Sequence, residues 1–264
     1  MGSIRVKGHV VICGWSERGY SIIQQLHQEV VKDKKPILII SEQISDIAFT
    51  DDDIYNNVYI VNGDPSKAKI LSRANIEDAD TAIILAESKN RTSADVASLA
   101  IALAIESLNV QVHTIVELMD ANNQEHFKRA GVDEVIAVSE TTEKLLAQGA
   151  VTHGITKLFL HLLTYLKQSN EIYKLPLPDG LIGTPFRQLL NDLIEYQVIP
   201  VGITRIEMST ETKQLKPREE FIINPEGDNR LRRGDNILVI AFSEPNIELL
   251  LSQVSNEASD VGDT

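Results

Sequence analysis

The sequence has 264 residues, of which 43% are hydrophobic and 24% are charged, an ordinary composition for one large or two small soluble domains. Its formal net charge of −13 repels the phosphates of nucleic acids, which argues against a nucleic-acid partner. The single cysteine, Cys13, excludes an internal disulfide and fits a reducing compartment such as the cytoplasm. No signal peptide or membrane span is expected, because the most apolar long stretch, 96–105, is about half as long as a membrane helix.

Strand and helix patterns alternate from residue 9 to residue 138. Runs of apolar, largely β-branched residues predict buried strands, and apolar residues at helical spacing predict the helices between them. The predicted strands are 9–13, 36–41, 58–61, 80–87, 111–118 and 134–138, and the predicted helices are 20–26, 67–74, 92–107 and 120–129. This alternation predicts an α/β fold over residues 8–139, a Rossmann-like doubly wound parallel sheet with helices on both faces.

The turn after the first strand has the spacing G-x-S-x-x-G and reads Gly14, Trp15, Ser16, Glu17, Arg18, Gly19. Gly14 can take backbone angles that other residues avoid, and Gly19 would let the helix approach the strand closely. The helix start then offers free N–H groups to a phosphate. Ser16 replaces the middle glycine of the dinucleotide-binding pattern, so the approach to a pyrophosphate is tighter, although its hydroxyl could donate to phosphate. A structural turn without a ligand is the alternative.

Further residues with the same chemistry follow the other strands. Glu42 lies just past the second strand, where an acid hydrogen-bonds the ribose hydroxyls of an adenosine and disfavours a 2′-phosphate; a solvated acid is the alternative. Gly63 and Asp64 follow the third strand, and Glu87 ends the fourth. Ligands bind outside the carboxyl ends of parallel strands, so these residues are expected to line one site with the loop 14–19.

The pattern changes after the sixth strand. Two helices are predicted at 140–148 and 155–167, within a crossover segment 140–169 whose apolar face needs cover. Either a partner subunit, by dimerisation, or the chain's own second domain would supply that cover. Residues 170–254 are predicted to form a small α+β lobe, with strands at 171–177, 198–207, 219–224 and 236–242 and helices at 183–196 and 245–254. Residues 255–264 are polar and acidic and are predicted to be disordered.

Catalytic motifs that would accompany a dehydrogenase are missing. The sequence contains no Tyr-x-x-x-Lys, Gly-x-Ser-x-Gly, His-Glu-x-x-His or Cys-x-x-Cys, and its six histidines are scattered. The sequence therefore favours a nucleotide-sensing module over an enzyme, with an NAD-dependent oxidoreductase as the alternative from another class.

Several blocks in a fixed order resemble the RCK domain, the regulator of K⁺ conductance with its TrkA-N and TrkA-C lobes. The blocks are 11–15 (VICGW), 62–65 (NGDP), 73–75 (RAN), 79–83 (ADTAI), 129–135 (RAGVDEV), 224–225 (NP) and 233–240 (RGDNILVI). The resemblance covers about residues 8–254. It implies a cytoplasmic gating module at the inner face of the cell membrane. Such domains pair through the crossover helices, and eight of them form a ring under a transmembrane potassium pore.

The resemblance also implies two ligand classes. One is an adenine nucleotide, NAD(H)-like or ADP-like, at the Gly14 loop and Glu42. The other is Ca²⁺, held by acids after the fourth strand and by an acid-x-acid pair that ends the fifth. Glu87 and Glu117 match these positions, but Met119 replaces the second acid of the pair and Asp120 is its candidate substitute. We therefore expect a nucleotide-sensing regulator of a potassium channel, with Ca²⁺ as the second ligand candidate and a regulatory subunit of a Trk- or Ktr-type potassium transporter as the alternative.

Overall fold

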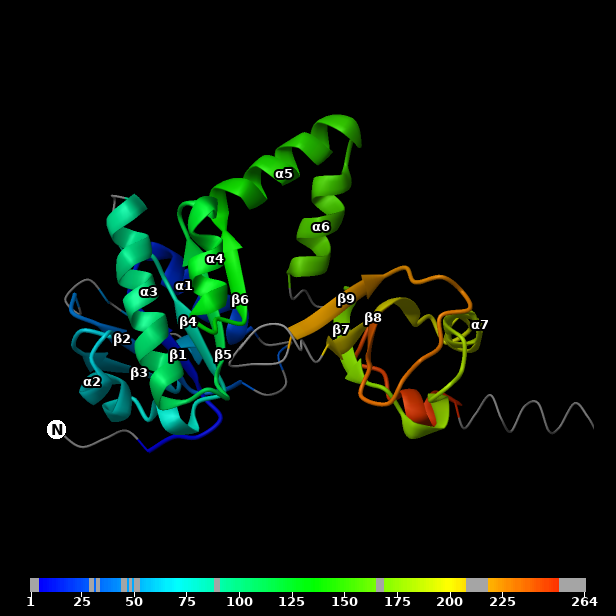
Figure 1. The fold of residues 1–264 in the computed structure, drawn as a ribbon, viewed down its shortest axis with the longest axis horizontal. Helices are drawn as coiled ribbons and strands as arrows, with labels where there is room; N and C mark the ends of the chain where they lie inside the picture. The colour runs from blue at the N-terminus through cyan, green and yellow to red at the C-terminus, as the bar shows by residue number, and fades with distance from the viewer. Residues whose placement is uncertain are drawn as a thin grey trace, which may run out of the picture. The chain divides into compact units, whose positions relative to one another are not determined.

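The fold is described from a computed structural model, which covers residues 5–28, 31, 34–43, 47, 49, 53–87, 91–164, 169–207 and 218–251 (Figure 1). The chain forms two compact units that divide between Thr156 and Lys157. Each unit has its own sheet and its own hydrophobic core. The tail predicted at 255–264 lies outside the described residues. Within the ranges given above, no helix has both the length and the apolar composition that crossing a bilayer requires.

The first unit is built on a six-stranded parallel sheet in the order β3-β2-β1-β4-β5-β6. The strands are β1 (Val10–Cys13), β2 (Ile37–Ser41), β3 (Val58–Asn62), β4 (Thr81–Ile84), β5 (His113–Leu118) and β6 (Glu134–Ala137). Every residue of β1 and β2 is buried, as the apolar runs predict. The chain winds outward in both directions from β1, so β1 and β4 flank the point where ligands bind in such sheets. The predicted Rossmann-like fold is confirmed.

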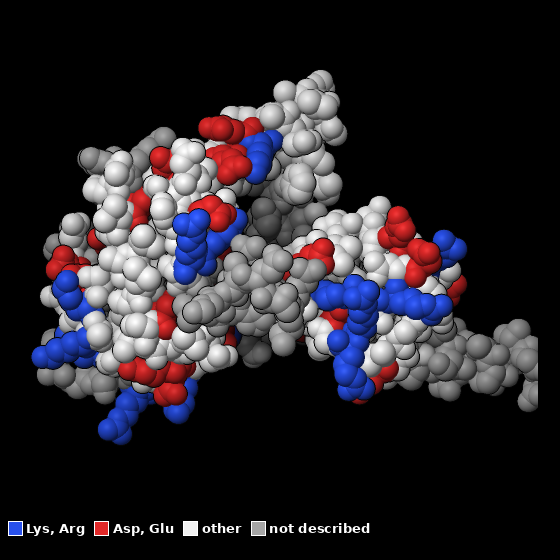
Figure 2. All heavy atoms as spheres, in the orientation of Figure 1, with Lys and Arg blue, Asp and Glu red and all other residues white. Residues whose placement is uncertain are grey.

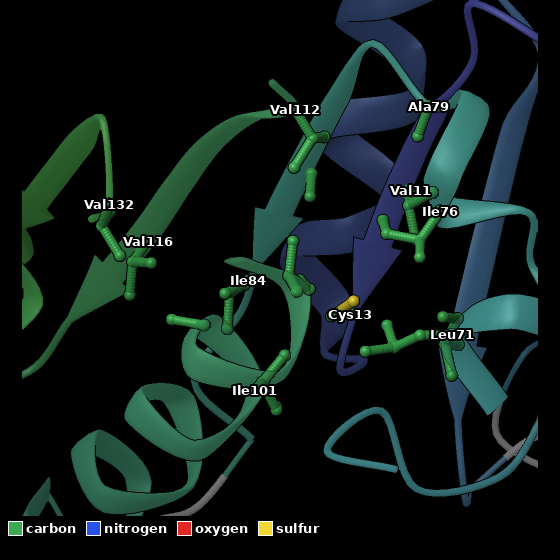
Figure 3. Packing of buried hydrophobic residues seen from close by; sticks show 14 of the residues in the cluster. Val11, Cys13, Leu71, Ile76, Ala79, Ile84, Ile101, Val112, Val116 and Val132 are labelled. Atoms are coloured by element: carbon green, nitrogen blue, oxygen red, sulfur yellow. The ribbon is translucent and has the colours of Figure 1, made fainter. Parts of the chain in front are cut away.

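Helices pack on both faces of this sheet. They are α1 (Glu17–Leu26), α2 (Ala68–Arg73), α3 (Arg91–Leu108) and α4 (Gln124–Arg129), with short 3₁₀ turns η2 (Asp53–Tyr55), η3 (Ile76–Asp78) and η4 (Ala121–Asn123). The alternation of side chains along β1 divides the interior in two. Val11 and Cys13 belong to one core (Figure 3), whereas Val10 and Ile12 belong to the other. Burial raises the pKa of the Cys13 thiol, which therefore packs as a neutral apolar group.

Two helices follow β6 in the predicted crossover segment. α5 (Val138–Val151) begins directly after β6, and α6 (Ile155–Leu163) follows a short break. Neither helix contains a buried residue. The most exposed large apolar side chains of the two helices are Leu146, Val151, Leu158, Phe159, Leu160 and Leu163. The division between the units falls inside α6, and so inside the predicted crossover segment 140–169.

The second unit is a four-stranded antiparallel sheet in the order β7-β10-β8-β9, with α7 packed on it. Its elements are β7 (Glu171–Pro176), η5 (Asp179–Leu181), α7 (Phe186–Ile194), β8 (Ile199–Glu207), β9 (Arg218–Ile223) and β10 (Asn236–Ala241), and residues 247–251 are helical. The buried face of α7, Phe186, Leu189 and Leu193, joins the core of the sheet. Basic side chains gather on the face of this unit shown in Figure 2. The predicted α+β lobe is confirmed.

A buried ion pair connects β8 to the turn before β10. Arg205 donates from Nε and Nη2 to the two carboxylate oxygens of Asp235, at 2.8 and 2.6 Å. Asp235 also accepts the backbone N–H of Arg232 at 2.8 Å, and its side chain is 1% exposed. The carboxylate therefore has a satisfied hydrogen-bond set, which a buried charge requires.

We expect Asp235→Ala to lower the free energy of unfolding of the second unit by about 3 kcal/mol, because it leaves the Arg205 charge and the Arg232 N–H unpaired. Urea denaturation followed by circular dichroism measures this change. Asp179→Ala is the matched control, because its ion pair with Arg233 is 79–80% exposed and should contribute little. Equal losses in the two variants would contradict the role of the buried pair.

His9, at the start of β1, is completely buried beside a backbone carbonyl. Its Nε2 lies 3.0 Å from the Ala74 oxygen, and its Nδ1 has no hydrogen-bond partner among the described residues. Burial lowers the pKa of this imidazole below its ordinary value of about 6.5, against the opposing effects of the Ala74 carbonyl and Asp78. The native state therefore holds His9 in the neutral form.

This pKa shift predicts that the first unit loses stability in acid. Below about pH 6.5 the unfolded chain binds a proton at His9 before the native state does, so the free energy of unfolding falls by up to about 1.4 kcal/mol per pH unit until the folded pKa is reached. Denaturation at pH 7.5, 6.5 and 5.5, followed by the fluorescence of the single tryptophan, Trp15, measures it. His9→Gln should have a flatter slope over this range, and an unchanged slope would contradict the assignment.

Candidate functional site

Gly14 opens the loop between β1 and α1, and the backbone there admits only glycine. Its φ is +87°, in the left-handed region. A Cβ at this position would lie 2.7 Å from the carbonyl oxygen of Leu85, at the end of the neighbouring strand. The conformational role that the sequence predicts for Gly14 is therefore confirmed, and a close backbone approach adds to it.

Gly19 makes room for the ring of Trp15, a contact that the sequence did not predict. A Cβ on Gly19 would lie 2.5 Å from this ring. Trp15 is 8% exposed and makes edge contacts with Tyr20 and Phe49, at centroid distances of 4.9 and 6.4 Å. The indole belongs to the core, and Trp15 takes part in the loop through its backbone N–H.

The first turn of α1 presents free donors at the edge of the sheet. Ser16 is the N-cap residue with extended backbone, yet its side chain makes no capping bond. Its Oγ is buried and has no partner among the described residues. The Gly19 N–H donates to the Ser16 carbonyl at 2.8 Å, which leaves the N–H groups of Glu17 and Arg18 as the helix-start donors beside this hydroxyl, an arrangement that suits an anionic oxygen. Glu17 and Arg18 follow with exposed side chains.

Glu87 reaches the loop from the segment after β4. Its Oε1 accepts the backbone N–H of Trp15 at 2.6 Å and lies 3.5 Å from the hydroxyl oxygen of Ser41. A Cβ on Gly14 would come within 3.1 Å of the Glu87 Cγ, so the side chain lies directly against the glycine. The structure thus brings the ends of β1, β2 and β4 together at one point, as the sequence predicts.

Arg18 and Glu117 form an ion pair between the start of α1 and the end of β5. Glu117 is 8% exposed and also accepts the N–H of Ala86 at 3.0 Å, whereas the Arg18 side chain is half exposed. The Glu117 carboxylate is therefore satisfied within the protein.

The predicted metal ligands Glu87, Glu117 and Asp120 are not brought together. Asp120 accepts the N–H of Asn122 at 3.0 Å and caps η4, while the other two carboxylates bind the donors given above. In the part of the chain that the structure describes, no three His, Cys, Asp or Glu side chains are placed to hold a metal ion. The sequence spacing of Glu87, Glu117 and Asp120 could not show that each carboxylate accepts a nearby backbone N–H.

Asp95, on α3, is an acid that sequence reasoning missed. It is 3% exposed and accepts the N–H groups of Met119 and Asp120 and the side-chain amide of Asn123, at 2.9, 3.1 and 2.8 Å. The sequence did contain a signal for it, because Asp95 is a charged residue within a helix that is otherwise largely apolar. Asp95 holds the turn after β5 in place.

The remaining predicted residues follow β2 and β3. Glu42 comes directly after β2 and is exposed. Gly63 has φ +150° and donates its N–H to the Ser41 carbonyl at 3.1 Å. Asp64 accepts the N–H of Ser66 at 2.8 Å, and hydrogen bonds from Ser66 lower its pKa. Asp64 therefore orders the turn into α2, whereas Glu42, like Glu17, is exposed to solvent at this edge.

We expect Gly14→Ala to destabilise the first unit by at least about 1–2 kcal/mol, because alanine at positive φ is strained and its Cβ meets the Leu85 carbonyl. Gly8→Ala is the matched control, since Gly8 has φ +60° but open space around it, and isolates the backbone contribution. Thermal unfolding followed by Trp15 fluorescence compares the two. A smaller loss in Gly14→Ala than in Gly8→Ala would contradict the close approach.

Comparison with known proteins shows what the chain is similar to. Residues 10–138 match the TrkA-N domain. The calcium-gated potassium channel TvoK of Thermoplasma volcanium is 26% identical over 248 residues, which cover 92% of this chain and 65% of TvoK. The ion channel POLLUX of Lotus japonicus is 24% identical over 248 residues, 89% of this chain and 25% of POLLUX. The human SLO3 gating ring has a TM-score of 0.65 at 16% identity, over 89% of this chain and 44% of that chain, and shares the fold.

Proposed function

We propose that the chain is a ligand-sensing regulatory domain that binds an adenine nucleotide and gates a potassium channel, since residues 10–138 match the TrkA-N domain. The observation that carries the proposal is the first turn of α1, at the carboxyl end of β1, where a buried Ser16 hydroxyl without a partner among the described residues lies beside the backbone N–H groups that begin the helix.

Each part of a nucleotide has a matching feature. The loop 14–19 supplies backbone N–H groups for a phosphate without any lysine. Glu42, one strand away, is solvent-exposed and suits the ribose hydroxyls, with its charge disfavouring a 2′-phosphate. An NAD(H)-like or ADP-like ligand fits these groups.

Gating follows from the relatives and from the crossover helices. TvoK is named a potassium channel and POLLUX an ion channel, and TvoK matches over nearly the whole of this chain. The exposed apolar side chains of α6 are the surface through which we propose that the domains pair, into a ring of eight under a transmembrane pore at the cytoplasmic face. Ligand occupancy then acts by changing the arrangement of paired domains and not by catalysis.

Ca²⁺ is a second candidate ligand, because TvoK is named as calcium-gated. A regulatory subunit of a Trk- or Ktr-type transporter would use the same domain with a different membrane partner. Hydride transfer in the presence of NAD(H) and a panel of alcohols and carbonyls would instead indicate an oxidoreductase.

We expect ADP or NAD(H) to raise the melting temperature of the chain, since a ligand that binds only the native state stabilises it by about 2.7 kcal/mol at 100 times its Kd.

Glu42→Gln should weaken nucleotide binding by about 1–3 kcal/mol in calorimetry, because it removes charge-assisted hydrogen bonds. Glu226→Gln, which removes the same charge from an exposed residue of the second unit, is the control. Unchanged affinity in Glu42→Gln would remove Glu42 from the site, and a shift with Ca²⁺ alone would favour the second ligand.

A further inference from the structure

The loop between β1 and α1 already holds an anion of the protein's own. The Trp15 N–H donates to Glu87 Oε1 at 2.6 Å, a short distance typical of a hydrogen bond to a charged acceptor. The Glu87 side chain lies against Gly14, where a Cβ would come within 3.1 Å of the Glu87 Cγ. The carboxylate therefore occupies a backbone donor that a bound phosphate would also use.

Basic side chains do not explain this position of Glu87. Within the described residues, no lysine or arginine forms an ion pair with Glu87, and Arg18 in the first turn of α1 pairs with Glu117 instead. The Glu87 carboxylate is held by the Trp15 N–H and by the positive end of α1, the features that attract a phosphate.

We propose that Glu87 is a displaceable internal anion, which closes the loop when no ligand is bound and exchanges with the phosphate of the ligand. This inference rests on the proposed nucleotide site. Two anions cannot share the Trp15 N–H, and at such short range they repel each other. A phosphate that binds through the Trp15 N–H must therefore displace Glu87.

The exchange makes the loop selective. Inorganic phosphate replaces the hydrogen bond between Glu87 and the Trp15 N–H with one of its own and adds no ribose or base contacts, so it binds weakly. A nucleoside diphosphate adds ribose and base contacts at the edge that carries Glu42, and these offset the displacement. Glu87 would thus reject free phosphate in favour of a nucleotide.

Glu87→Gln tests the exchange. Glutamine keeps the length of the side chain and an amide oxygen for the Trp15 N–H, but it carries no charge. We expect inorganic phosphate and ADP, without divalent cations, to bind at least about tenfold more tightly, which is about 1.4 kcal/mol, with the larger gain for phosphate. Calorimetry and the fluorescence of Trp15, the single tryptophan, measure affinity, and the NMR shift of the Trp15 amide proton reports its acceptor.

Glu42→Gln is the charge-matched control for inorganic phosphate alone, because it removes one negative charge from the same edge, and phosphate lacks the ribose that Glu42 is proposed to bind. A general reduction of negative charge would tighten phosphate binding equally in both variants and would overturn the proposal. If wild type binds ADP and Glu87→Gln binds it equally or more weakly, with or without Mg²⁺, Glu87 is not a competing anion although the nucleotide site stands. If neither protein binds ADP or phosphate, the nucleotide site fails and this inference with it.

Discussion

The candidate site depends on how closely two strand ends approach each other at Gly14. β1 and β4 are hydrogen-bonded neighbours, and a Cβ on Gly14 would lie 2.7 Å from the Leu85 carbonyl oxygen after β4. Only glycine fits this close approach, and the chain turns here so that α1 begins three residues later, at Glu17. Glu87, which accepts the Trp15 N–H, also lies against Gly14. The backbone at Gly14 thus determines both where the N–H groups of the loop point and how Glu87 approaches the Trp15 N–H.

The electrostatics of the edge come from backbone groups more than from side-chain cations. The chain carries a net charge of −13, yet the less exposed acids at the sheet edge accept N–H groups of neighbouring segments. Glu117 binds the N–H of Ala86, and Asp95 binds that of Met119. Carboxylates tied down separately in this way do not converge on a common point. An anion site in such an acidic protein must rely on oriented peptide dipoles, which add no net charge.

The sequence predicted the features that depend on periodicity and missed those that depend on side-chain direction. The alternation of Val10 and Ile12 with Val11 and Cys13 already indicated a strand between two cores, and the order of strands and helices indicated the sheet. It could not show that the ring of Trp15 turns back onto Gly19, because a rotamer depends on aromatic neighbours distant in sequence, such as Phe49. For the same reason the sequence could not separate an acid that caps a turn, Asp120, from one that is free to bind a ligand.

The contacts around Arg18 connect the loop to the helices proposed for pairing. Arg18, in the first turn of α1, is ion-paired with Glu117 on β5, and Glu117 lies opposite Ile136 on β6. β6 ends at Ala137 and α5 begins at Val138, so no flexible linker separates the sheet from the crossover. Contiguity alone does not make a switch, since both ends must bias an element that has two states. The exchange of Glu87 for a phosphate at the Trp15 N–H would provide two such states at the start of α1. Arg18, whose ion pair with Glu117 connects α1 to β5 and so to β6 and α5, lies in the first turn of the same helix.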